Sequence, residues 1–97
     1  MVLESAYLNV KPGLEAEFES AFREASGIIA SKNGYLWHQL HRTIENPSLY
    51  LLLVGWGSLE AHTVGFRDSP EYQDWKTRLH HFYQPFPTVL HHSQVYP

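Results

Sequence analysis

The segment that most constrains the fold of this chain is residues 49–56, whose first six residues read Leu-Tyr-Leu-Leu-Leu-Val and are all apolar. Successive side chains of a β-strand point to opposite faces of the sheet, so a strand with one face in water alternates between apolar and polar residues. Because this strand does not alternate, both of its faces need cover. The plainer alternative is a central strand that tolerates a few leucines in water.

Helices of the same chain can cover only one of these two faces. A bare apolar sheet face of several hundred square ångströms is unusual on a soluble monomer. A second copy packed face to face would bury it, and closed two-fold symmetry is the commonest arrangement of such pairs. We therefore expect a homodimer that forms through the uncovered face of the sheet.

A helix is predicted by apolar residues that recur every three or four positions from Leu14 to Ile29. Pro12 suits the first turn of this helix, and Asn33-Gly34 is typical of a helix stop. Ser58 and Ser69 are placed to cap two later helical segments. We expect these over residues 59–66 and from Pro70 onward, and strands over residues 2–10, 35–45, 49–56 and 88–96.

The resulting order is strand, helix, strand, strand, helix, strand, which is the ferredoxin-like βαββαβ arrangement of the α+β class. The sheet is expected to be four-stranded and antiparallel, and right-handed crossovers place both helical regions on the same face. The chain has 97 residues, which suits one domain over residues 1–97. No repeat or linker divides it.

Charge and composition exclude several classes of protein. The 7 lysines and arginines are scattered and the formal net charge is -3, so no basic stripe is available for nucleic acid. No apolar run is long enough to span a membrane. Glu4 stands where a signal peptide would be basic and then apolar, so a cytoplasmic location is expected. Without cysteine, thiolate metal sites and cysteine nucleophiles are excluded.

The chain holds 7 histidines, which makes a metal site the first idea to test. His91 and His92 are neighbours on a predicted strand and point to opposite faces, and His80 and His81 diverge by about 100° around a helix. No HExxH pattern is present. We therefore expect no metal; the alternative is a site made by ligands that converge from distant parts of the chain.

His62 lies on the short predicted helix, one turn before Phe66 and shortly after Trp56. It is either a half-buried histidine that bonds to a backbone carbonyl or an acid–base group at the rim of an aromatic cavity. The same two readings apply to His80, His81 and His91. The number of amphipathic rings for so small a chain favours a ligand cavity.

Short motifs in the second half of the chain resemble the antibiotic biosynthesis monooxygenase family. These are Trp56-Gly57-Ser58-Leu59-Glu60-Ala61-His62, Phe66-Arg67-Asp68-Ser69-Pro70-Glu71-Tyr72 with Trp75, His81-Phe82-Tyr83 and Pro87-Thr88-Val89. Near the start, Asn9-Val10-Lys11-Pro12-Gly13 and a helix with Phe18 and Phe22 also fit. The order and spacing of these motifs extend over essentially the whole chain.

The resemblance implies a dimeric α/β barrel, in which two ferredoxin-like sheets pack face to face and each holds a pocket under its helices. It also implies oxygenation of a small electron-rich aromatic or quinol without metal, flavin or haem. Such a substrate is deprotonated before it reduces O₂, which requires a base and a dry, apolar cavity. His62 is the first candidate for the base, with His81 or His91 as base or oxyanion donor. Trp56, Phe66, Trp75 and Tyr83 are the candidates to hold the substrate ring.

Two other functions fit the same residues. A dimer that binds a small aromatic molecule without turnover would use the same rings. Haem-degrading relatives are less consistent with the sequence, because Lys76 stands near the position of their axial histidine and Ala6 near that of their asparagine. No cofactor is therefore expected.

Overall fold

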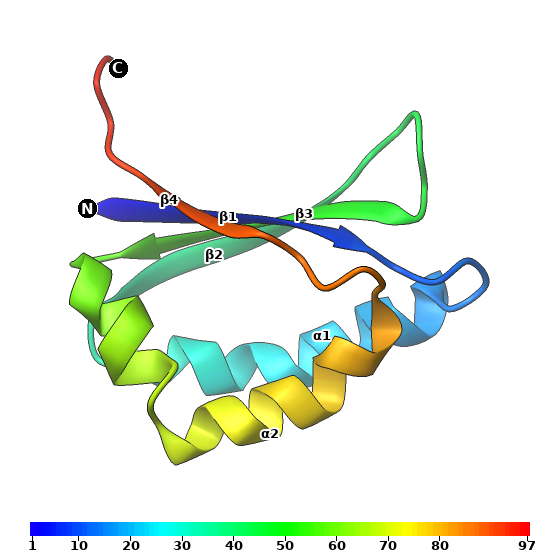
Figure 1. Cartoon of the computed structure of the whole chain (residues 1–97), viewed down its shortest axis with the longest axis horizontal. Coiled ribbons are helices and arrows are strands. Elements are labelled where there is room, and N and C mark those ends of the chain that lie inside the picture. Colours follow the sequence, from blue (N-terminus) through cyan, green and yellow to red (C-terminus); the bar gives the residue numbers. More distant parts are fainter.

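The computed structural model describes all 97 residues. Its elements follow the predicted order, and Figure 1 shows one four-stranded sheet above two main helices. The elements are β1 (Val2–Asn9), α1 (Glu15–Ala30), β2 (Tyr35–Arg42), β3 (Leu49–Trp56), the π-helical turn η1 (Ala61–Phe66), α2 (Pro70–Leu79), the 3₁₀ turn η2 (His80–Phe82) and β4 (Val89–His92). The strand order is β2-β3-β1-β4, with all neighbours antiparallel. The ferredoxin-like α+β fold is confirmed.

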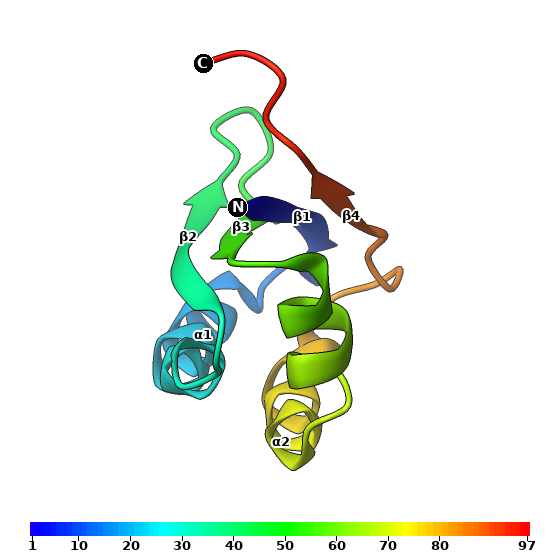
Figure 2. The ribbon, with the colours of Figure 1, turned by 90° about the vertical axis from the view of Figure 1, so that its left-hand side faces the viewer.

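Both main helices cover the same face of the sheet, as right-handed crossovers require. Viewed from the side, α1 lies under the β2 side and α2 under the β1 and β4 side (Figure 2). The core lies between these layers and consists of 16 buried apolar residues. On β3, Tyr50, Leu52, Val54 and Trp56 point into it, each at most 5% exposed. None of the helices is long and apolar enough to cross a membrane.

Several element boundaries differ from the prediction. Helix α1 begins at Glu15, because Pro12 and Gly13 lie in a turn in which Gly13 has a φ of 92°. Ser69 precedes α2 but does not cap it; its hydroxyl donates instead to the carbonyl of Phe66 at 2.6 Å. The predicted last strand, residues 88–96, is shortened to Val89–His92, which pairs with residues 3–6 of β1.

The opposite face of the sheet carries no helix. The register places Leu3, Ser5 and Tyr7 of β1 on this face, next to Leu51 and Leu53 of β3. Trp37 of β2 and Leu90 of β4 complete an apolar surface that we call the bare face. Tyr7 and Leu90 are 57% and 53% exposed, so this surface is open to solvent in the single chain. Homodimerisation through it stays a prediction.

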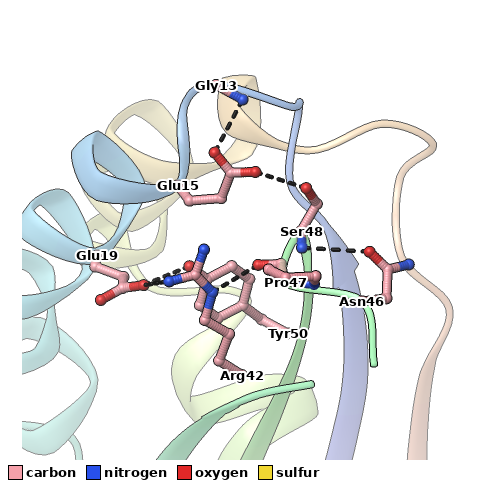
Figure 3. A network of polar contacts seen from close by, with 8 residues as sticks. All are labelled: Gly13, Glu15, Glu19, Arg42, Asn46, Pro47, Ser48 and Tyr50. Atoms are coloured by element: carbon pink, nitrogen blue, oxygen red, sulfur yellow. Dashed lines mark hydrogen bonds and ion pairs between the residues drawn. The ribbon is translucent and has the colours of Figure 1, made fainter. Parts of the chain in front are cut away.

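A polar network ties the β2–β3 hairpin to the start of α1 (Figure 3). Glu15 accepts hydrogen bonds from the backbone N–H of Gly13 at 2.9 Å and from the hydroxyl of Ser48 at 2.6 Å. Glu19 accepts from the hydroxyl of Tyr50 at 2.5 Å and pairs with Arg42 at 3.4 Å. These contacts fix the hairpin against α1, on the side of the core away from η1.

Candidate functional site

A cavity of about 380 Å³ lies between the helix-covered face of the sheet and the helices. Its wall is formed by 17 residues, of which 12 are hydrophobic, from β1, β3, α1, η1, α2 and the segment that leads into β4. Small-molecule sites typically have about this volume and this mainly apolar lining. Since a cavity of about 150 Å³ accepts a benzene ring, there is room for a larger aromatic compound.

Two buried polar side chains face this cavity, Glu4 from β1 and His62 from η1, which are 5% and 3% exposed. Glu4 Oε1 accepts a hydrogen bond from Trp56 Nε1 at 2.9 Å and lies 3.4 Å from His62 Nε2. The indole of Trp56 also stacks on the imidazole of His62, with ring centroids 5.2 Å apart and planes inclined by 15°. Trp56 therefore contacts both groups on their side away from the cavity and fixes their orientation.

The second ring nitrogen of His62 points to β4. His62 Nδ1 forms a hydrogen bond of 2.8 Å with Nε2 of His91, which is half-buried and lies opposite Glu4 in the β1–β4 register. An ionised Glu4 favours the tautomer of His62 with its proton on Nε2, and His91 then donates to Nδ1. The chain of polar contacts thus runs from Glu4 through His62 to a side chain near the surface.

Burial sets the protonation states of this cluster. It raises the pKa of Glu4, against the hydrogen bond from Trp56 and the positive charge of Arg67, which both lower it. For His62, burial first and then the charges of Arg67 and His91 lower the pKa to about 3. At neutral pH His62 is therefore a neutral imidazole, and Glu4 is the group whose pKa is shifted toward neutrality.

The turn η1 carries His62 and Phe66 and has a π-helical hydrogen bond, from the N–H of Arg67 to the carbonyl of His62 at 3.0 Å. The wider turn brings His62, Phe66 and Arg67 onto one wall of the cavity. π-Helical turns are rare and are found frequently at functional sites. Gly34 has a φ of 86° and lies against Ala61, where a β-carbon would be 2.5 Å from that of Ala61. This close approach positions the start of η1.

Of the residues predicted from the sequence, Phe66, Trp75 and Tyr83 line the cavity together with His62. Trp56 is fully buried and lies behind Glu4 and His62, not on the wall. His91 contacts His62 but does not line the cavity. His81 is exposed on η2 and outside the cavity, so the structure does not bring it to the other candidates.

Three polar residues on the cavity wall were not predicted: Glu4, Arg67 and Tyr72. His80, for which the sequence left two readings open, also lines the cavity. Glu4 had a signal in the sequence, because it is the one charged residue among the apolar side chains at alternate positions of β1. His80 lies between the rings of Tyr83 and Phe86, and its buried Nδ1 has no hydrogen-bond partner. A buried polar atom of this kind is suited to bind a polar group of a ligand.

Comparison with known proteins agrees with this architecture. The family model of the antibiotic biosynthesis monooxygenases matches residues 1–78. The chain belongs to this family. It is 56% identical over 95 residues to the uncharacterized protein YczJ of Bacillus subtilis (strain 168), an alignment that covers 98% of this chain and all of YczJ.

Solved structures of similar proteins share the fold over nearly the whole chain. A Bordetella bronchiseptica protein assigned to the antibiotic biosynthesis monooxygenases is 34% identical, with a TM-score of 0.93 over 98% of this chain and 97% of that one. SnoaB, a cofactor-independent oxygenase from Streptomyces nogalater, is 21% identical, with a TM-score of 0.86 over 99% of this chain and 94% of its own. The likeness to SnoaB supports the fold alone.

Proposed function

We propose that this member of the antibiotic biosynthesis monooxygenase family is a cofactor-independent monooxygenase that acts on a small electron-rich aromatic or quinol substrate. The observation that carries the proposal is the 380 Å³ cavity, largely apolar, with the buried Glu4–His62 pair on its wall. An apolar cavity excludes water, and a buried acid–base pair can remove the proton that such a substrate loses before it reduces O₂. SnoaB, which shares the fold, is described as a cofactor-independent oxygenase, the class of activity proposed here.

In the proposed reaction, residues around the cavity have separate roles. Phe66, Trp75 and Tyr83 hold the ring of the substrate. The substrate proton passes to the Glu4–His62 pair, and His91 fixes the orientation of His62. The carbanion or phenolate then gives an electron to O₂, and the two radicals combine to a peroxide. The Glu4–His62 pair returns its proton to the peroxide, and the hydroperoxide loses water with the remaining hydrogen of the same carbon. A ring methylene and O₂ thus yield a ketone and H₂O.

The enzyme is proposed to work as a homodimer in the cytoplasm. The bare face supports the dimer, because Leu51 and Leu53 would otherwise face water beside Tyr7 and Leu90. The two helix-side cavities of such a dimer lie on the outer sides of the paired sheets. Each protomer therefore keeps its own set of site residues.

Oxygen uptake by the metal-free protein tests this function. We expect O₂ consumption with anthrone or hydroquinone compounds, together with a raised melting temperature for those that bind. Binding without turnover for the whole panel would contradict the monooxygenase and indicate a binding module. Neither turnover nor a shift would contradict both.

A substitution that fills part of the cavity tests whether the reaction takes place there. Ala6 lines the cavity and is 3% exposed, so Ala6→Leu places extra bulk inside it. We expect turnover to fall at least tenfold, whereas Ala16→Leu on the exposed side of α1 leaves it unchanged. Equal activity of the two variants would place the reaction elsewhere on the molecule.

A further inference from the structure

Arg67 is a half-buried cation on the wall of the same cavity, at the junction between η1 and α2. None of the four ion pairs in the structure includes it, and its side chain takes part in no hydrogen bond with another residue. A guanidinium stays charged at all relevant pH values and favours paired oxygen acceptors. Beside an apolar cavity, a cation without a partner favours an anionic ligand group.

The charge of Arg67 affects the pKa values of titratable groups on every surrounding element. After burial, its charge is the next cause that lowers the pKa of His62 and of His91. It also opposes the effect of burial on the pKa of Glu4 and of Tyr72. These groups come from η1, β4, β1 and α2, and Arg67 lines the same cavity as Glu4, His62 and Tyr72. Its charge therefore acts on the polar groups of the cavity wall.

The charge of the cavity selects among anionic ligands. With Glu4 ionised, one negative and one positive charge are present, and they are not in contact. A carboxylate ligand would add a second negative charge beside Glu4, which is unfavourable at low dielectric. A phenol or an enol adds no charge on entry. If its proton moves to Glu4, the negative charge moves to the ligand oxygen and the total stays the same.

We propose roles for two side chains in the ionisation of this substrate: the carboxylate of Glu4 takes the proton of its phenol or enol hydroxyl group, and Arg67 pairs with the oxyanion that forms. The O–H bond of the ligand breaks, a new O–H bond forms on Glu4, and the electron pair remains on the ligand oxygen. No electron is transferred to or from the protein. The inference rests on the proposed function, because this oxyanion is the species that would then reduce O₂.

Preorganisation explains why this arrangement favours the reaction. Arg67 is already in place before the charge moves, so the oxyanion is stabilised without rearrangement of solvent. His62 stays neutral and holds Glu4 from one side, while Trp56 holds it from the other. The base is therefore the carboxylate, and His62 is a positioning residue.

The test is the absorption spectrum of bound 4-nitrophenol, whose ionised form has a separate band. At a pH where the free compound is mainly neutral, we expect the bound compound to be ionised, with its apparent acid dissociation constant raised at least tenfold. 4-Nitroanisole, which has no proton to give, and 4-nitrobenzoate, which enters as an anion, are expected to bind more weakly. A neutral spectrum of bound 4-nitrophenol, or tighter binding of 4-nitrobenzoate, would overturn the inference.

Variants assign the effect to the two side chains. Glu4→Gln keeps an acceptor for Trp56 but cannot take the proton, and Arg67→Gln removes the cation; both are expected to lose the ionised band. Arg23→Gln is the control, because Arg23 is exposed on α1 and does not line this cavity. Circular dichroism melting verifies folding, and if Glu4→Gln does not fold, Arg67→Gln decides alone. Retention of the band in folded Arg67→Gln would contradict the proposal.

The spectral test separates this inference from the proposed function. Ionised 4-nitrophenol in a protein that never consumes O₂ would support the proton transfer and refute the monooxygenase. Oxygen consumption by a protein that binds only neutral phenols would support the monooxygenase and refute the roles given to Glu4 and Arg67.

Discussion

At the scale of single residues, the site depends on polar groups that are buried in an otherwise apolar core. Glu4 and His62 would each be costly to bury alone, and their mutual contact and their bonds to Trp56 and His91 reduce this cost. Side chains with shifted pKa values are concentrated at functional sites. The low pKa of His62 also links the cluster to the stability of the protein.

Acidification is expected to destabilise the protein through His62. Its pKa falls from 6.5 to about 3 on folding, so its contribution is complete above pH 6.5 and is lost as the pH falls toward 3. Because one pKa unit corresponds to about 1.4 kcal/mol, the loss between pH 6.5 and pH 4 is on the order of 2–3 kcal/mol. Urea unfolding of wild type and His62→Gln measures this.

Substitutions at His62 and at His81 separate the contribution of His62 to the pH dependence of stability from that of an exposed histidine. His62→Gln is expected to flatten the decline of the free energy of unfolding between pH 6.5 and pH 4. His81→Gln, at an exposed position outside the cavity, is expected to keep the wild-type slope. Parallel slopes for all three proteins would show that His62 is not buried as a neutral imidazole.

At the scale of elements, β3 decides how the sheet is used. Its alternate residues Tyr50, Leu52 and Val54 are buried under the helices, while Leu51 and Leu53 lie on the bare face. Near the end of the strand, Gly55 leaves room for the indole of Trp37, whose Nε1 would be 2.5 Å from a β-carbon at that position. The indole of Trp37 therefore packs against Gly55 on the bare face, and this surface is suited to pack on another sheet.

A charge on β3 tests the dimer. Leu53→Asp places a carboxylate at the middle of the bare face, where pairing would bury it without a partner. We expect wild type to be a dimer at micromolar concentration by light scattering and Leu53→Asp to dissociate at concentrations at least 100-fold higher.

The matched control is Thr77→Asp, on the exposed surface of α2. It introduces the same charge away from the bare face and is expected to stay dimeric. A monomeric wild type at micromolar concentration would show that the bare face has another role.

At the scale of the whole molecule, the sequence was sufficient for the fold and only partly for the site. Short runs of β-prone residues bounded by turns identify the strands, and apolar residues spaced three and four apart identify α1, because that period follows directly from helix geometry. The sequence predicts an ordinary short helix where the structure has the π-helical turn η1, since no local residue pattern distinguishes the two hydrogen-bond spacings.

The limit of local sequence patterns also explains which of the site residues the sequence predicts and which it misses. Phe66, Trp75 and Tyr83 were found because large rings stand out in a sequence. Glu4 and Arg67 are separated by more than half of the chain, and only the tertiary structure places them on the wall of the same cavity.

The most direct test of the proposed activity follows the two atoms of ¹⁸O₂ through one turnover of the metal-free protein with an anthrone. A cofactor-independent monooxygenase places one labelled atom in the new carbonyl of the product and releases the other as labelled water. Mass spectrometry of the product measures the number of ¹⁸O atoms in each molecule. A control reaction in labelled water measures how much oxygen the carbonyl exchanges with the solvent. We expect one ¹⁸O atom in each product molecule. Recovery of both atoms as hydrogen peroxide, with an unlabelled product, would contradict the monooxygenase.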